Sequence, residues 1–339
     1  MLLALKVAPQ RSTLYAGLAR TLAAPELLAS PLGGRVRACE PARLAGQEYL
    51  LVELAGEPDA ADLDVLSRLG ATSEVHEYFP AIGDVPGPLL RPVEPTWAPF
   101  LPVEMVEARR YRGKTNELFT AVLLNLALFA GDFAAEPAAR LRVLDPLAGG
   151  GTTLFTALVR GYDAAGIERE REDVESTDAY TRQFLRGAGV PFKRVDERLR
   201  GVGRRVLYTI GRGGDTRRLA LALGDTRAAP DLLGGLPGGT RFHAVAADLP
   251  YGIQHQGQVA DLLIDALPAW AALLLPGGAA ALAWESSRLT RAAAIELVEQ
   301  HPGLRVRDDP PYDALAHAVD RAIKRRDVLV VQKRGSVGA

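Results

Sequence analysis

Four acidic residues each end a short apolar run of the kind that forms a buried β-strand: Asp145, Glu168, Asp225 and Asp248. Ligands of open α/β sheets bind beyond the carboxyl ends of the strands, so acids at these positions lie where a ligand binds. Glu168 stands about 20 residues after a glycine-rich turn, a spacing at which a carboxylate accepts ribose hydroxyls. Asp225 is placed to receive the amine edge of an adenine. We therefore predict a nucleoside pocket.

The first of these acids begins a glycine-rich turn, Asp-Pro-Leu-Ala-Gly-Gly-Gly-Thr-Thr, over residues 145–153. Glycine allows the backbone to approach a ligand closely, and Thr152 or Thr153 can cap the following helix while touching a carboxylate. The turn is not Gly-x-Gly-x-x-Gly and lacks the lysine of a phosphate-binding P-loop, so a P-loop is not supported. The alternative is a plain strand–turn–helix junction that requires small residues.

The segment Asp248-Leu249-Pro250-Tyr251-Gly252 follows another apolar strand. Its residue types suit the methylation of a conjugated amine, whose delocalised lone pair is a poor nucleophile. Asp248 and the backbone carbonyls of Leu249 or Pro250 can accept the amine hydrogens and favour a pyramidal nitrogen. Tyr251 can stack on a base that has been taken out of its helix. The alternative is a proline-containing turn after a buried strand.

Helices and apolar strands alternate from about residue 103 onward. Helical patterns lie at residues 114–130, 152–161, 259–275 and 291–301. Short apolar runs lie at 141–145, 164–168, 219–223, 242–247, 279–284 and 328–332. This alternation predicts a doubly wound α/β domain, in which helices cover both faces of a mostly parallel sheet.

A proline-rich segment separates this region from the N-terminal residues. Residues 80–102 contain seven prolines, which remove backbone donors and exclude a regular helix or a central strand. We expect a small N-terminal α+β domain over residues 1–80, a Pro-rich linker over 81–102 and a larger domain over 103–339. Within the first domain we expect strands at 2–7 and 49–54 and helices at 12–23 and 60–69.

Composition excludes several classes of protein. The 339 residues include 40 Lys and Arg against 41 Asp and Glu, a net charge of −1, which rules out a uniformly basic binder of the histone type. The single cysteine, Cys39, excludes an intramolecular disulfide and a cysteine-clustered zinc or iron–sulfur site, and the five histidines are scattered. We expect no metal, no membrane span and a cytoplasmic location.

Basic residues are nevertheless concentrated in one part of the chain. Residues 193–218 contain nine Lys and Arg and three Asp and Glu, a net charge of +6, within an insertion over about 190–218 between the second and third core strands. A second basic cluster near the C-terminus consists of Arg321, Lys324, Arg325 and Arg326. Such segments attract phosphates with salt-dependent affinity. The alternative is a solvated loop whose charges balance the acids elsewhere.

In the order of its motifs the chain resembles the class I S-adenosylmethionine (SAM)-dependent amino-methyltransferases. It is similar, more narrowly, to their RNA methylase branch, which includes the tRNA guanine-N2 methyltransferases and shares Asp-Pro-x-x-Gly-x-Gly-Thr and Asp-(Pro/Leu)-Pro-Tyr-Gly. Residues 113–117 resemble the pre-core segment of that branch, and residues 317–327 resemble its final hairpin. The resemblance covers about residues 105–333 and implies a Rossmann-like, seven-stranded sheet whose last strand is antiparallel.

The resemblance also implies a cofactor, SAM, and the residues that bind it: Thr115, Asn116, Asp145, Pro146, Gly149, Gly151, Thr152, Thr153, Glu168, Asp225 and Asp248. It implies that Asp248, Leu249, Pro250 and Tyr251 form the catalytic group that holds the target amine. The implied substrate is RNA, most directly guanine N2 of tRNA. The chain departs from the family at Leu249, where proline is commoner, and in its first 80 residues, which show no clear counterpart of the family's larger RNA-capture region.

Two other functions remain open from the sequence. One keeps the chemistry but changes the acceptor, as in a DNA adenine-N6 or cytosine-N4 methyltransferase or an enzyme acting on a protein or small molecule. The other is a non-catalytic protein of the same fold that binds RNA or a partner.

Overall fold

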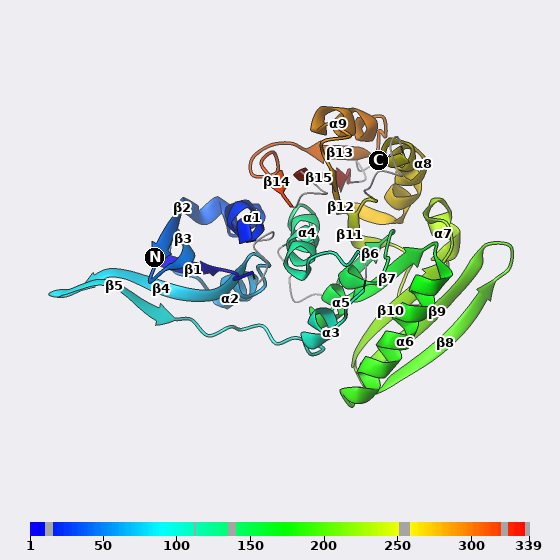
Figure 1. Cartoon of the computed structure of the whole chain (residues 1–339), viewed down its shortest axis with the longest axis horizontal. Coiled ribbons are helices and arrows are strands. Elements are labelled where there is room, and N and C mark those ends of the chain that lie inside the picture. Colours follow the sequence, from blue (N-terminus) through cyan, green and yellow to red (C-terminus); the bar gives the residue numbers. More distant parts are fainter. Residues whose placement is uncertain (11–15, 112, 135–139, 251–257, 320–324, 336–339) are drawn as a thin grey trace.

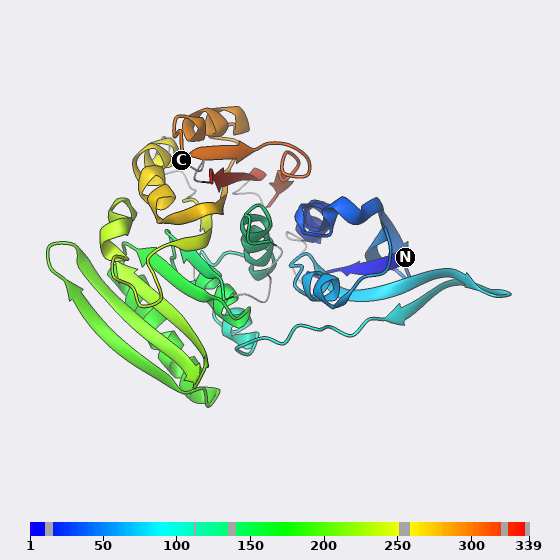
Figure 2. The same ribbon diagram turned by 180° about the vertical axis from the view of Figure 1, so that it is seen from behind.

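The computed structural model of the chain describes residues 1–10, 16–111, 113–134, 140–250, 258–319 and 325–335 (Figure 1). Two sheets organise it, one formed by the N-terminal residues and one by the remainder. Figures 1 and 2 show the N-terminal sheet at one end of the molecule and the larger sheet, covered by helices, at the other.

The N-terminal unit is an antiparallel sheet with two helices. Its elements are β1 (Leu2–Val7), α1 (Ala16–Ala29), a short 3₁₀ turn η1 (Gly33–Arg35), β2 (Val36–Leu44), β3 (Gln47–Leu54), α2 (Ala60–Ser67), β4 (Thr72–Ile82) and β5 (Val85–Pro92). The strand order is β2-β3-β1-β4-β5, so the first six main elements form a βαββαβ unit of the split type. The expected α+β character of this part is confirmed.

The structure corrects the expected extent of the proline-rich linker. The sequence predicts a Pro-rich linker over 81–102, but β4 continues to Ile82 and β5 pairs with it from Val85 to Pro92. Strand β5 has a partner on one side only, and a proline without an N–H is tolerated at such an edge. Residues 93–103, which contain no helix or strand, then lead to α3 (Glu104–Glu107).

The large sheet contains the seven strands implied by the resemblance. They are β6 (Arg142–Asp145), β7 (Asp163–Glu168), β10 (Asp215–Leu223), β11 (Phe242–Asp248), β12 (Leu274–Glu285), β13 (Leu304–Arg307) and β15 (Arg325–Lys333). Their order is β13-β15-β12-β11-β6-β7-β10, with parallel pairing from β12 through β10 and with β15 antiparallel to both of its neighbours. The predicted Rossmann-like sheet with an antiparallel last strand is confirmed.

Helices cover both faces of this sheet, as expected. The remaining elements are α4 (Glu117–Phe129), α5 (Thr152–Val159), α6 (Arg171–Gly187), η2 (Thr226–Ala228), α7 (Ala229–Leu232), α8 (Gln258–Leu273), α9 (Arg291–Glu299) and the short β14 (His317–Ala318), which pairs with β15. Consecutive strand residues point to opposite faces. Val143 therefore packs in one apolar core with α4, α5 and α6, whereas Leu144 packs in a second core with α7, α8 and α9.

The N-terminal unit shares the first of these cores. Leu18 and Leu22 of α1 are buried in the same apolar cluster as Phe119 of α4. A buried carboxylate, Glu26, accepts hydrogen bonds from the backbone N–H of Ala71 at 2.8 Å and from the side chain of Asn125 on α4 at 2.6 Å. The N-terminal sheet is therefore fixed to α4 by apolar packing and by satisfied buried polar groups.

The predicted insertion between the second and third core strands is a β-hairpin. Strands β8 (Phe192–Leu199) and β9 (Gly203–Arg212) are antiparallel and continue the large sheet beyond β10. Helix α6 lies against this extension in both views (Figures 1 and 2).

Candidate functional site

The four predicted acids lie at the same edge of the large sheet. Asp145, Glu168 and Asp248 are the last residues of β6, β7 and β11, and Asp225 follows the end of β10. Because these strands are adjacent and parallel, their carboxyl ends meet where the sheet reverses its order on either side of β6. A cavity of about 540 Å³ lies there, and its lining includes Glu168, Asp225 and Asp248. The structure thus brings together the acids that the sequence placed far apart.

The glycine-rich turn between β6 and α5 requires glycine for two different reasons. Gly149 and Gly151 have φ angles of 48° and 86°, a left-handed conformation that other residues rarely adopt. At Gly150 an added Cβ atom would lie 2.3 Å from the ring of Tyr111, whose hydroxyl group is hydrogen-bonded to the Oγ1 atom of Thr152. Tyr111 therefore packs directly on the turn, a contact that the sequence pattern did not indicate.

Glu168 holds the turn in place through the backbone. Its Oε2 atom accepts the N–H of Gly149 at 2.8 Å, and its Oε1 atom accepts the N–H groups of Arg169 and Glu170 at 2.7 and 2.8 Å. A carboxylate offers about four acceptor positions, so about one remains for a ligand hydroxyl. The two ribose hydroxyls that the sequence assigns to Glu168 would therefore compete with backbone N–H groups for its acceptor positions.

Asp145 is buried at the centre of the edge. Its Oδ1 atom accepts the N–H of Leu147 at 3.0 Å, and its carboxylate is also hydrogen-bonded to Thr153. Burial raises the pKa of Asp145 to about 7, and the negative charges of Asp248 and Glu168 add to the increase. Thr153 touches a carboxylate as predicted, but the residue that caps α5 is Gly151, without a side-chain hydrogen bond.

At the far end of the cavity, Asp225 is paired with an arginine. Its carboxylate accepts the backbone N–H of Arg227 at 2.8 Å and the guanidinium of the same residue at 3.0 Å. Arg227 also bonds Asp265 of α8 at 3.0 Å. About half of the Asp225 side chain remains exposed, so its carboxylate is accessible from the cavity.

Asp248 lies at the opposite end of the cavity, and about 14% of its side chain is exposed. Its Oδ2 atom accepts a hydrogen bond from Thr115 Oγ1 at 2.9 Å and lies 3.5 Å from Nη2 of Arg326. Among the described residues, its Oδ1 atom has no hydrogen-bond partner. Burial raises the pKa of Asp248, against the lowering effects of Arg326 and of the Thr115 hydroxyl. One oxygen is thus held by the protein and the other is left to accept a hydrogen.

The residues that follow Asp248 have separate environments. The side chain of Leu249 is fully buried in the second apolar core, whereas Pro250 lines the cavity. Tyr251, which the sequence nominated to stack on a base, lies outside the described residues.

The pre-core residues contact Asp248 and the N-terminal unit. Thr115 bonds Asp248, as noted, although the sequence assigned Thr115 to the cofactor. The Asn116 side chain accepts the N–H of Phe119, which caps α4, and donates to Gln10 at 3.1 Å. Pro146 lines the cavity, and Thr152 is bonded to Tyr111. The long-range contacts of Gln10 and Arg326 have no local sequence signal.

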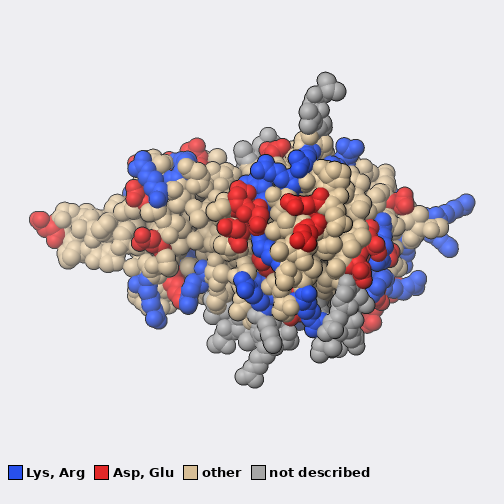
Figure 3. Space-filling view, turned by 90° about the horizontal axis from the view of Figure 1, so that it is seen from above, with Lys and Arg blue, Asp and Glu red and all other residues tan. Residues whose placement is uncertain are grey.

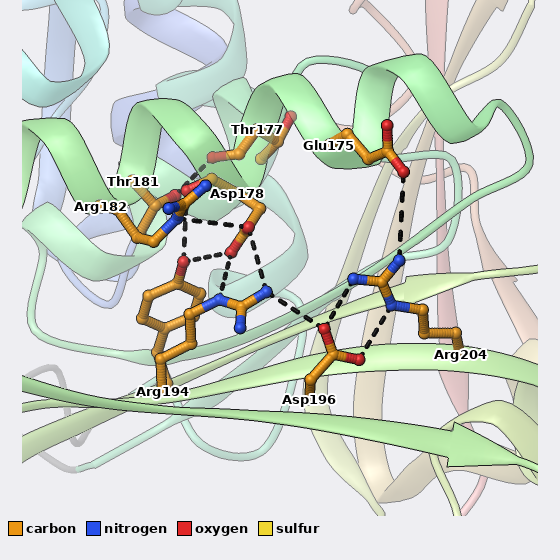
Figure 4. A network of polar contacts seen from close by, with 9 residues as sticks. Glu175, Thr177, Asp178, Thr181, Arg182, Arg194, Asp196 and Arg204 are labelled. Atoms are coloured by element: carbon orange, nitrogen blue, oxygen red, sulfur yellow. Dashed lines mark hydrogen bonds and ion pairs between the residues drawn. The ribbon is translucent and has the colours of Figure 1, made fainter.

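Most charges of the predicted basic insertion are paired inside the molecule. Figure 4 shows Arg194 of β8 bonded to Asp178 of α6 and Arg204 of β9 bonded to Asp196, with distances of 2.6 to 3.1 Å for these two pairs. Arg205 is buried and donates to Glu197 at 2.7 Å and to the carbonyl of Gly234 at 2.7 Å. The net charge of the segment therefore overstates its free positive surface, because these arginines form bonds within the hairpin and to the elements beside it.

The remaining basic residues of the hairpin lie at two different edges of the sheet. Arg198 and Arg200 are exposed near the β8–β9 turn, and the pairing of Arg204 with Leu223 places that turn at the same edge of the sheet as the cavity. Lys193 and Arg212 are exposed at the opposite edge. On the face seen in Figure 3, basic and acidic side chains are interspersed.

The C-terminal basic cluster is also not a surface patch as a whole. Arg325 is exposed, whereas Arg326 is 3% exposed and lies beneath Asp248. Arg321 and Lys324 lie outside the described residues. In the described part of the chain, no group of three or more His, Cys, Asp and Glu side chains could hold a metal, and no helix has the length and apolar character of a membrane span.

Comparison with known proteins gives only distant structural matches. No protein-family model matches the chain, and no curated protein matches it significantly. The chain is similar to TrmN from Thermus thermophilus (18% identity over 88% of this chain and 60% of that chain, TM-score 0.41). It is also similar to a precorrin-6y C5,15-methyltransferase from Geobacter metallireducens (15% identity over 70% of this chain and 100% of that chain, TM-score 0.41). A third similar structure is an rRNA methylase from Streptococcus thermophilus (13% identity over 66% of this chain and 99% of that chain, TM-score 0.36).

Proposed function

We propose that the chain is a SAM-dependent N-methyltransferase that acts on an exocyclic amine of a nucleobase in RNA, most directly guanine N2 of tRNA. The observation that carries the proposal is the buried Oδ1 atom of Asp248, which has no hydrogen-bond partner among the described residues and lies at the edge of a nucleoside-sized cavity. A buried acceptor without a donor is costly, so such an atom indicates a ligand hydrogen.

The residues of the cavity fit the proposed cofactor. Its volume of about 540 Å³ is within the usual range for small-molecule sites. At Gly149 an added Cβ atom would meet no protein atom within 4 Å, so the backbone of the turn borders open space that a ligand can fill. Glu168 would accept a ribose hydroxyl with its remaining acceptor position, and the exposed half of Asp225 would accept the amine of the adenine.

The chemistry then requires little more than orientation and hydrogen-bond acceptors. When bound, SAM supplies an electrophilic methyl group, which passes to the amine nitrogen as its carbon–sulfur bond breaks. Asp248 Oδ1 accepts one N–H of the amine and so directs the nitrogen lone pair toward that methyl group. The nitrogen gains one bond to carbon and loses one proton, to Asp248 or to solvent. Pro250 forms part of the cavity wall at this end.

The choice of RNA as the acceptor is supported by the motif resemblance and by charge. Arg198 and Arg200 are exposed at the sheet edge that carries the cavity, without an ion-pair partner in the described part of the chain, and arginines in this position suit backbone phosphates. The paired arginines of the same hairpin do not contribute to this surface. The proposed RNA contact therefore involves fewer arginines than the net charge of the insertion implies.

Incubation with methyl-labelled SAM and separate pools of tRNA, rRNA, DNA and protein tests the proposal. We expect label in tRNA at guanine N2, identified by nucleoside analysis, and no label with Asp248→Ala. Label in DNA or protein would mean that the acceptor is not RNA, while the proposed methyl transfer would still hold. The absence both of label and of SAM binding by calorimetry would overturn the proposal in favour of a non-catalytic binding protein.

A further inference from the structure

A buried charged side chain, Arg326, lies beside Asp248 and comes from a strand distant in sequence. Arg326 is the second residue of β15, which is separated from β11 by β12. Its guanidinium lies 3.5 Å from Asp248 Oδ2 and 4.7 Å from the ring centroid of Phe119. Arg326 is 3% exposed and the Asp248 side chain about 14%, so both charges are largely withdrawn from water, where an ionised carboxylate is stabilised by a compensating charge.

The other ionisable groups around Asp248 do not supply that charge. Asp145 on β6 is a neighbouring buried acid, and Asp261 on α8 is an acid that lines the cavity. Glu285, at the end of β12, is paired with Arg288. His317 on β14 packs against Phe119, and burial lowers the pKa of His317 to about 4, so this side chain is neutral at pH 7. Among the described residues, Arg326 is the cation paired with Asp248.

The contacts of Asp248 are divided between its two oxygens. Thr115 and Arg326 both approach Oδ2, from the pre-core segment and from the last strand. Neither approaches Oδ1, which remains the free acceptor among the described residues. The two contacts on one oxygen fix the orientation of the carboxylate and leave the other, buried oxygen without a donor among the described residues.

We infer that Arg326 is a positioning residue, the counter-ion that keeps Asp248 ionised and presents Oδ1 as a hydrogen-bond acceptor. The inference rests on the proposed function for the identity of the hydrogen that Oδ1 accepts. It gives the antiparallel strand β15 a role in the site, because this strand, on the far side of β12 from β11, carries the arginine that lies beside Asp248.

The first experiment needs no methyl acceptor. The titration of Asp248 is followed by NMR of protein labelled with carbon-13 at aspartate carboxyls, and the signals are assigned with Asp248→Asn and Asp145→Asn. In Arg326→Met we expect the midpoint of Asp248 to rise by about 1 to 3 pH units, because an adjacent cation has been removed. Arg326→Lys, which keeps the charge, should restore most of the difference.

The adjacent Arg325 provides the matched control, since it is exposed on the same strand. Arg325→Met should leave the midpoint of Asp248 unchanged. An unchanged midpoint in Arg326→Met, or an equal rise in both variants, would overturn the inference. If Arg326→Met does not fold, Arg326→Gln removes the charge while keeping a polar, though shorter, side chain, and the same outcomes apply to it.

The second experiment links the counter-ion to the reaction. With labelled SAM and unfractionated tRNA, the acid limb of the kcat/KM profile should move to higher pH in Arg326→Met by the same interval as the NMR midpoint. A loss of rate by one factor at every pH would show a merely structural role. If the NMR midpoint shifts in a protein that methylates no acceptor, the role of Arg326 as counter-ion is supported and the proposed function is refuted.

Discussion

The backbone N–H of Leu249 donates a hydrogen bond to the carbonyl oxygen of Ala283 at 2.8 Å. Leu249 follows the proposed catalytic acid, and Ala283 lies opposite that acid in the neighbouring strand β12. Proline, which is commoner at this position in the family that the chain resembles, has no N–H and cannot donate this bond. The departure from the family motif is therefore matched by an additional link between β11 and β12 beside the site.

Leu249→Pro should destabilise the protein although it restores the commoner motif. The lost hydrogen bond leaves the carbonyl of Ala283 without this donor at a buried position, at a cost of about 1 to 3 kcal/mol in the free energy of unfolding. Chemical denaturation measures the change, with Leu249→Met as a control that keeps the N–H and the side-chain volume. A proline variant as stable as the methionine variant would show that the bond contributes nothing.

Gly150→Ala tests the packing of Tyr111 on the glycine-rich turn. The new methyl group would meet the ring at 2.3 Å, so we expect a loss of about 1 to 3 kcal/mol in stability and weaker binding of S-adenosylhomocysteine by calorimetry. Adding Tyr111→Ala, which removes the ring, should restore part of the stability that Gly150→Ala loses. Gly187→Ala, where an added Cβ meets no atom within 4 Å, is the matched control and should bind normally. Normal binding by Gly150→Ala would refute the contact.

The raised pKa of Asp145 predicts a pH-dependent stability. Its pKa is about 7 in the folded protein and about 3.8 when unfolded, so the folded state binds the proton more tightly and loses stability as pH rises between these values. The loss is up to about 4 kcal/mol. Asp145→Asn cannot ionise and should remove this part of the dependence. We expect urea unfolding between pH 4.5 and 8 to give a steeper fall for the wild type, and parallel curves would contradict the prediction.

The two kinds of arginine in the β8–β9 hairpin should behave differently toward RNA. Arg198→Ala and Arg200→Ala should each reduce the slope of log affinity against log salt by about 1. Arg204→Ala should leave the slope unchanged but lower the stability, because its guanidinium is bonded to Asp196 within the hairpin. Filter binding of tRNA over a series of salt concentrations measures the slopes. Equal changes in all three variants would mean that pairing does not withdraw Arg204 from the RNA surface.

The core of the fold follows from local sequence because its strands are apolar on both faces. Runs such as those ending at Asp145 and Asp248 are continuous and short, and each is followed by a turn. The acids at their ends share one edge for topological reasons alone, which is why the cavity could be predicted. Strand β8 carries five charged residues among its eight, and β5 carries three prolines. Both are edge strands, whose exposed positions give no apolar signal.

The contacts that support the site could not be derived in the same way. Arg325 and Arg326 are adjacent basic residues, and nothing local distinguishes the exposed one from the one buried beneath Asp248. Thr115 and Asp248 are 133 positions apart and meet only because α4 packs on β11. Tyr111 reaches Gly150 through an irregular segment. These relationships depend on tertiary packing, which overrides local preference.

The most direct test of the proposed function is the effect of Asp248→Asn on single-turnover methyl transfer from labelled SAM to tRNA, together with calorimetry of S-adenosylhomocysteine. The substitution keeps the size of the side chain but weakens the acceptor at Oδ1. We predict a loss of about 100-fold or more in the rate of transfer with a far smaller change in cofactor affinity. An unchanged rate in a folded, cofactor-binding variant would contradict the role of Asp248 as the group that holds the amine.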